Sequence, residues 1–92
     1  MCSREIEIKN AAGLHARPAS AFVHLAGGFQ SEIELRRVGE ESRYNAKSII
    51  MLLALGLGRG ERAVLTAHGP DEREAVEALA ALVDGFSDDA KL

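Results

Sequence analysis

The sequence predicts an α+β fold in which helices cover one face of an antiparallel β-sheet. Short stretches of alternating polar and apolar residues, typical of strands with one buried face, are interspersed with stretches whose apolar residues recur at helical spacing. The resulting order is strand, helix, strand, strand, helix, strand, helix. Because strands and helices do not alternate regularly, this order favours an antiparallel sheet over a parallel one.

The first strand and the first helix are predicted by two different periodicities. Residues 4–9 alternate charged residues with isoleucine, so the isoleucines share one buried face. Residues 10–13 predict a turn. Between residues 16 and 26, apolar side chains fall at helical spacing and predict a short amphipathic helix. We expect this helix to end at Gly27-Gly28, because glycine adopts the left-handed conformation that closes many helices.

Two more strands and an ambiguous segment follow. Residues 31–36 alternate again and predict the second strand, and residues 42–46 predict a short third strand after a turn at Gly39. The apolar run at residues 48–55 fits either a strand or a helix by its pattern alone. Its leucine and methionine content favours a helix, for which Ser48 is a suitable N-cap.

The last part of the chain predicts one strand and one longer helix. Residues 61–67 predict the fourth strand, which ends at Gly69-Pro70. The acidic residues 71 and 72 suit the first turn of a helix, where the backbone dipole is positive. The apolar face of this last helix consists of Ala75, Val76, Leu79, Leu82, Val83 and Phe86.

Composition predicts a single domain over residues 1–92 and excludes several function classes. A chain of this length buries about 60–65% of its unfolded surface, which allows one core but no deep substrate cavity. The formal net charge of −3 provides no basic stripe for nucleic acid. No apolar stretch is long enough for a signal peptide or a membrane span, so we expect a cytoplasmic protein. The single cysteine, Cys2, allows no intramolecular disulfide.

The sequence predicts neither a metal nor a cofactor. The three histidines, His15, His24 and His68, do not fall at a metal-ligand spacing. The sequence also contains no glycine-rich phosphate-binding loop and no second candidate for general acid–base catalysis. Both observations argue against an independent enzyme.

The segment Gly13 to Ser20, GLHARPAS, carries the clearest chemical signal. Proline is favoured in the first turn of a helix, so Pro18 places the helix start close to His15. The first amides of a helix lack internal partners and point outward with the positive end of the dipole, which makes them an anion site. Arg17 adds a guanidinium beside this site.

These features together suit phosphoryl transfer through a histidine. A neutral imidazole is a nucleophile near neutral pH, and a phosphoryl group attached to His15 would lie beside helix amides and the Arg17 guanidinium. Taken alone, a histidine next to a helix start is more often a cap or an ordinary surface residue. The pattern therefore leaves both interpretations open.

A family resemblance favours the reactive interpretation. GLHARPAS resembles the active-site signature of the HPr phosphocarriers of the bacterial phosphoenolpyruvate-dependent sugar phosphotransferase system. AKSIIMLLALGL is similar to the family's second helix and its flanks, and AHGPDEREAVEAL to the turn into its last helix. The similarity spans essentially the whole chain, with the elements in the same order.

The resemblance implies a fold, a function and partners. The fold is an open-faced β-sandwich, βαββαβα, with a four-stranded antiparallel sheet and three helices on one face. Enzyme I, phosphorylated from phosphoenolpyruvate, passes the phosphoryl group to Nδ1 of His15, and the carrier donates it to an Enzyme IIA. Arg17 then stabilises the phosphoryl group. Such a protein is a stoichiometric carrier and not an enzyme. Independently of the resemblance, we expect a monomer, because no long apolar seam remains once the core is assigned.

Ser48 matches a position that a dedicated kinase, HPr kinase/phosphorylase, phosphorylates in carriers from many bacteria. A phosphate there would add nearly two negative charges to a docking surface, although Ser48 as a simple N-cap explains the residue equally well. If Leu52 and Leu55 face the core, other apolar residues of the same helix must face outward and form a docking patch. The docking residues that the resemblance implies are Ala16, Arg17, Ser20, Lys47, Ile49 and Met51.

Some features depart from the sugar-system carriers. Three positions on the docking face that often carry lysine in those carriers are occupied here by Ser20, His24 and Gly27. The ending LVDGFSDD and the GPDE turn are similar to NPr, the carrier of the nitrogen-related branch. Two alternatives therefore stay open: an NPr-type carrier, and a regulatory binding module of the same fold. Regulatory modules of this kind lack the active histidine, whereas His15 and Arg17 are both present here.

Overall fold

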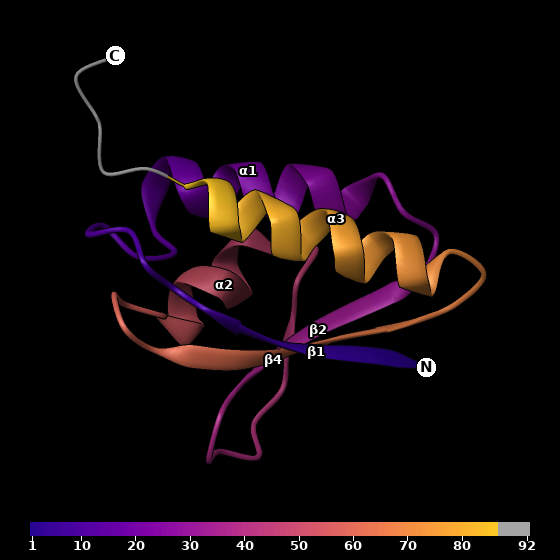
Figure 1. Cartoon of the computed structure of the whole chain (residues 1–92), viewed down its shortest axis with the longest axis horizontal. Helices are drawn as coiled ribbons and strands as arrows, with labels where there is room; N and C mark the ends of the chain where they lie inside the picture. Colours follow the sequence, from indigo (N-terminus) through magenta and orange to yellow (C-terminus); the bar gives the residue numbers. More distant parts are fainter. Residues whose placement is uncertain (87–92) are drawn as a thin grey trace.

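The computed structural model describes residues 1–86, which contain four strands and three helices in the predicted order (Figure 1). The strands are β1 (Cys2–Glu7), β2 (Glu32–Arg37), β3 (Tyr44–Asn45) and β4 (Arg62–His68). The helices are α1 (Ala16–Gly27), α2 (Ile49–Leu55) and α3 (Glu72–Gly85). The fold class predicted from the sequence is confirmed.

The sheet has the strand order β1-β4-β2-β3, and every pair of neighbours is antiparallel. The register places Ile6 opposite Ala63 and Leu35 opposite Leu65, so apolar residues of three strands share one face. All three helices lie over this face, and the opposite face is open (Figure 1). The alternation in the sequence is therefore the alternation between a helix-covered and an open side of one sheet.

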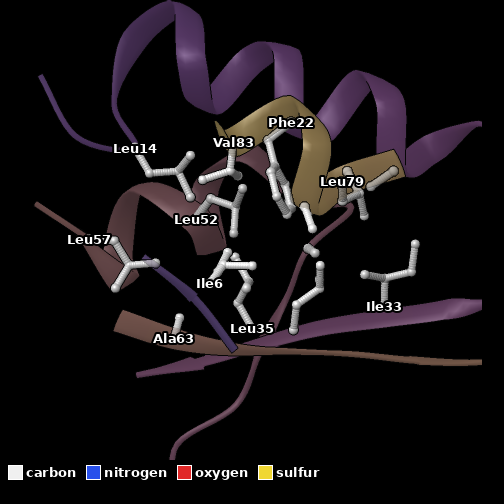
Figure 2. Packing of buried hydrophobic residues seen from close by; sticks show 14 of the residues in the cluster. Ile6, Leu14, Phe22, Ile33, Leu35, Leu52, Leu57, Ala63, Leu79 and Val83 are labelled. Carbon is white, nitrogen blue, oxygen red and sulfur yellow. The ribbon is translucent and has the colours of Figure 1, made fainter. Parts of the chain in front are cut away.

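The hydrophobic core lies between the sheet and the helices (Figure 2). Phe22 projects from α1 into this layer and is the large aromatic side chain at its centre, with no exposed surface. Leu52 enters from α2 and Leu79 from α3, and both are fully buried. Leu14 and Leu57, from two loops, are also fully buried and extend the core toward one end of the molecule.

The ambiguous segment is a helix, as its composition favours. Ser48 is its N-cap, and the Ser48 hydroxyl accepts a hydrogen bond from the Met51 amide at 3.3 Å. The helix ends at Gly56, which adopts the left-handed conformation with a φ angle of 64°. Leu52 and Leu55 face the core, so the condition from which an outward apolar face was expected is met.

The prediction for the end of α1 is wrong in its conformation. Gly28 follows the helix with a right-handed backbone, φ −80° and ψ −8°, and not a left-handed one. The Gly28 amide donates to the Leu25 carbonyl at 3.1 Å, and the Phe29 amide donates to the Ala26 carbonyl at 3.2 Å. These shorter-range bonds tighten the last turn and satisfy its carbonyls, so no left-handed residue is needed.

Candidate functional site

The loop before α1 is anchored to the loop after α2. Gly13 has a φ angle of +69°, and a Cβ at this position would lie 2.6 Å from the Leu57 carbonyl oxygen. The Leu14 amide donates to the same carbonyl at 2.8 Å. Inside the loop, the buried Asn10 side-chain amide donates to the Gly13 carbonyl at 3.1 Å. Residues 13 and 14 are thus held against Leu57, and the chain enters α1 from a defined position.

His15 is the residue immediately before α1 and the N-cap of that helix. Its backbone is extended, with φ −128° and ψ 166°, and its side chain makes no capping hydrogen bond. The imidazole is exposed to solvent. Ala16, the next residue, has a φ angle of +50°, a conformation that costs an alanine about 1–3 kcal/mol. The chain therefore adopts an unfavourable backbone conformation directly beside the exposed ring.

The first turn of α1 leaves hydrogen-bond donors free beside His15. Within residues 1–86, the backbone amides of Ala16 and Arg17 have no hydrogen-bond acceptor, and Pro18 has no amide hydrogen. No acidic residue lies in this turn. The Arg17 side chain is exposed and makes no ion pair or hydrogen bond with the described residues. Two amides, the positive end of the helix dipole and one guanidinium are thus available to an anion attached to the ring.

The predicted docking residues lie on two helices that pack against each other, α1 and α2, and on the segment just before α2. Ala16, Arg17 and Ser20 are exposed on α1. On α2, Ile49 is exposed and Met51 is half-buried. The half-buried Lys47 lies before α2, and its ammonium donates to the Phe29 carbonyl at 2.7 Å, just beyond the end of α1. The ammonium of Lys47 is thus used within the fold.

Two further apolar side chains of α2 are exposed: Ile50 at 76% and Leu53 at 45%. Together with Ile49 they form an outward apolar face, which we call the α2 patch (Ile49, Ile50 and Leu53). The spacing predicted that some members of this run must face outward, and this is confirmed. Ile50 and Leu53 could have been selected as the outermost ones, since both lie on the side of the helix opposite Leu52 and Leu55.

The positions that depart from the sugar-system pattern are also on the surface. Ser20, His24 and Gly27 are all exposed along α1. The ending LVDGFSDD, on which the similarity to NPr was noted, lies only partly within the described residues, which end at Phe86; residues 87–89 lie outside them. Within residues 1–86, no helix has the length and apolar character needed to cross a membrane.

Comparisons with known proteins show the family to which this chain belongs. The family model described as "PTS HPr component phosphorylation site" matches residues 2–84. The HPr-like protein Crh of Halalkalibacterium halodurans is 43% identical over 91% of this chain and 98% of its own length. The phosphocarrier protein HPr of Cupriavidus necator is 41% identical over 90% of this chain and 91% of its own length.

The solved structures that resemble the chain include members of the same two groups. HPr from Thermoanaerobacter tengcongensis superposes with a TM-score of 0.86 at 44% identity, covering 91% of this chain and 92% of that one. Crh from Bacillus subtilis, described as a domain-swapped dimer, gives a TM-score of 0.70 at 42% identity, over 91% of this chain and 94% of that one. The chain belongs to the HPr family of bacterial phosphotransferase-system phosphocarriers, which are phosphoryl-transfer proteins and not enzymes.

Proposed function

We propose that this protein accepts a phosphoryl group from Enzyme I on His15 and donates it to an Enzyme IIA of the sugar phosphotransferase system in the cytoplasm. The observation that carries this proposal is the exposed His15 imidazole beside the unpaired amides of Ala16 and Arg17. Because this imidazole is neither buried nor engaged in a capping hydrogen bond, it is accessible to the active site of a partner protein. The donors beside it are already in place for a phosphoryl group.

The chemistry uses few groups of this chain. Nδ1 of His15 attacks the phosphorus of phosphorylated Enzyme I, so that a nitrogen–phosphorus bond forms as the bond to the donor breaks. The amides of Ala16 and Arg17 and the Arg17 guanidinium match the charge on the phosphoryl oxygens. In the second step a nucleophile of Enzyme IIA attacks the phosphorus, so that a bond to Enzyme IIA forms as the nitrogen–phosphorus bond of His15 breaks. The apolar α2 patch supplies a contact surface for both partners.

Incubation with Enzyme I and phosphoenolpyruvate tests the proposal. We expect the intact mass of the protein to rise by one phosphoryl group, and the modification to be lost in acid and kept in base, as for a phosphohistidine. Subsequent addition of a sugar-system Enzyme IIA should remove the added mass. A modification that survives acid would contradict transfer to a histidine. If only the Enzyme IIA of the nitrogen-related branch removed the phosphoryl group from the protein, the protein would be an NPr-type carrier.

We also propose regulation through Ser48, which stands before the α2 patch. A phosphate on Ser48 would bring nearly two negative charges to the surface that meets a phosphorylated partner. With ATP and an active HPr kinase/phosphorylase, we expect one acid-stable phosphate on the wild type and none on Ser48→Ala. The same substitution removes the bond to the Met51 amide and should lower the free energy of unfolding by about 1 kcal/mol in urea titrations. An unmodified wild type beside a modified control carrier would argue against this regulation.

A regulatory binding module is the second candidate, because relatives of this chain include proteins named Crh. The Enzyme I assay separates the two functions, since a purely regulatory module would gain no acid-labile phosphate. We propose a monomeric carrier, whereas solved relatives include dimers of Crh and of HPr. Light scattering on the same preparation measures the oligomeric state.

A further inference from the structure

A polar network joins the end of β2 to the loop between α2 and β4. Arg37, the last residue of β2, donates from Nε to Glu61 at 3.1 Å. Its Nη2 donates to the carbonyls of Leu55 at 2.8 Å and Gly56 at 3.3 Å. Glu61 in turn accepts a hydrogen bond from the Gly58 amide at 2.7 Å. One guanidinium and one carboxylate thus bind three backbone groups of the segment 55–58.

Arg37 supplies a charge that α2 itself lacks. The last turn of α2 contains no basic residue, and its carbonyls carry the negative end of the helix dipole. The guanidinium has a planar fork that can bind the carbonyls and Glu61 at the same time, which a lysine ammonium cannot do with the same geometry. The side chain of Arg37 is only 23% exposed, so solvent screens these bonds less than it screens those of a surface pair.

The pKa directions of the two groups agree with this arrangement. The hydrogen bond to Glu61 raises the pKa of Arg37, although partial burial acts against it. The Gly58 amide and then the Arg37 side chain lower the pKa of Glu61. Both groups are therefore held in their charged forms.

The segment that this network holds is the support for the loop that carries His15. Leu57 lies between the carbonyl groups that Arg37 binds and the Gly58 amide that Glu61 binds. The Leu57 carbonyl receives the Leu14 amide at 2.8 Å, and the backbone of Gly13 lies directly against Leu57 and Gly58. Both loops lie at the same end of the molecule, on the left in Figure 1, and the side chains of Leu14 and Leu57 meet the core at that end (Figure 2).

We propose that Arg37 and Glu61 are positioning residues for His15, acting through Leu57 and Leu14. The inference rests on the proposed phosphoryl transfer through His15. Within residues 1–86, neither side chain makes a hydrogen bond or an ion pair with His15 or Arg17. They hold the 55–58 segment in place, and this segment sets the position of the backbone that enters α1. A displacement of about 1 Å at a reacting group can cost about a hundredfold in rate, so a support of this kind matters for transfer.

The test compares Arg37→Met with two controls in the full chain. Arg43→Met removes an exposed arginine whose ion pair within residues 1–86, to Glu34 at 3.4 Å, involves neither the 55–58 segment nor Glu61. Asp71→Asn replaces a carboxylate that accepts hydrogen bonds from the Gln30 and Ser31 amides. These residues lie at the opposite end of the helices from the His15 loop, on the right in Figure 1. This second control destabilises the protein without touching the 55–58 segment.

Amide hydrogen exchange provides the readout that does not depend on phosphoryl transfer. In Arg37→Met we expect faster exchange at Leu14 and unchanged exchange at Phe29. In Asp71→Asn we expect the opposite result: the Gln30 and Ser31 amides should exchange faster, and the exchange rate of the Leu14 amide should stay unchanged. Glu61→Gln should resemble Arg37→Met, and the double variant should add little to either, because both residues belong to one network.

Transfer from Enzyme I provides the second readout. We expect Arg37→Met to lower the maximal rate about tenfold. The carrier concentration for half-maximal rate should change by less than about twofold, because the α2 patch is kept. Unchanged exchange at Leu14, or an equal loss of rate in Asp71→Asn at equal stability, would overturn the positioning role. A wild type that gains no phosphoryl group would instead refute the proposed function, and the exchange data would still decide whether Arg37 holds the Leu14 loop.

Discussion

Replacing His15 by glutamine is expected to abolish phosphoryl acceptance from Enzyme I. Glutamine keeps a polar side chain of similar reach but has no nucleophilic nitrogen, so the nitrogen–phosphorus bond cannot form. The amides of Ala16 and Arg17 would remain as an anion site without an acceptor. Intact mass after incubation with Enzyme I and phosphoenolpyruvate should show no added phosphoryl group at times when the wild type is fully modified.

The fold should not change in this variant. The His15 side chain is exposed and makes no capping bond, so we expect the free energy of unfolding to stay within about 0.5 kcal/mol of the wild type. His68→Gln is a matched control, since His68 is an exposed histidine at the end of β4 and lies outside the site. Equal phosphorylation of His15→Gln and wild type would mean that another residue is the acceptor.

Replacing Gly13 by alanine is expected to have the largest effect on stability among the substitutions considered. The φ angle of +69° disfavours any side chain, and the new Cβ would lie 2.6 Å from the Leu57 carbonyl oxygen and 2.9 Å from the Gly58 Cα. The backbone strain and the forced displacement together should cost about 2–4 kcal/mol. Urea titration followed by circular dichroism measures this loss directly.

Gly39→Ala separates the two causes of that loss. Gly39 has a φ angle of +90°, but a Cβ there would meet no atom within 4 Å. It should therefore show only the conformational cost, about 1 kcal/mol. If Gly13→Ala were no more destabilising than Gly39→Ala, the close approach of the two loops would not hold in solution. The larger loss should be accompanied by slower phosphoryl acceptance, because the displaced loop carries His15.

Local pattern was sufficient for most elements. The strands were predictable because a side-chain period of two places every second residue on one face, and α3 because its apolar residues recur at helical spacing. The start of α1 was also predictable, since Pro18 has a preset φ angle and no amide hydrogen. GLHARPAS contains His15, Arg17 and the helix start within eight consecutive residues, so the place of the candidate site was predictable, whereas the choice of a reactive histidine over an ordinary surface one depended on the family resemblance.

Strand boundaries depended on partners that lie far away in sequence. The first strand was predicted over residues 4–9 but runs from Cys2 to Glu7, because Cys2 and Ser3 pair with residues of β4. Ile8 leaves the ladder and joins the turn, where it exchanges hydrogen bonds with Gly60 and Glu61. The third strand is reduced to Tyr44–Asn45, the two residues in register with Leu35 and Glu34 of β2, and the Ala46 amide beside it still donates to the Ile33 carbonyl at 2.9 Å.

The sequence by itself determined the element order, the amphipathic faces and the placement of His15 and Arg17 at the start of a helix, because these depend on residues that are neighbours along the chain. Only the tertiary structure decided that Leu57 supports Leu14 and that Arg37 binds the end of α2. Both contacts join segments that are more than 15 residues apart, and neither helical nor strand periodicity contains information about them.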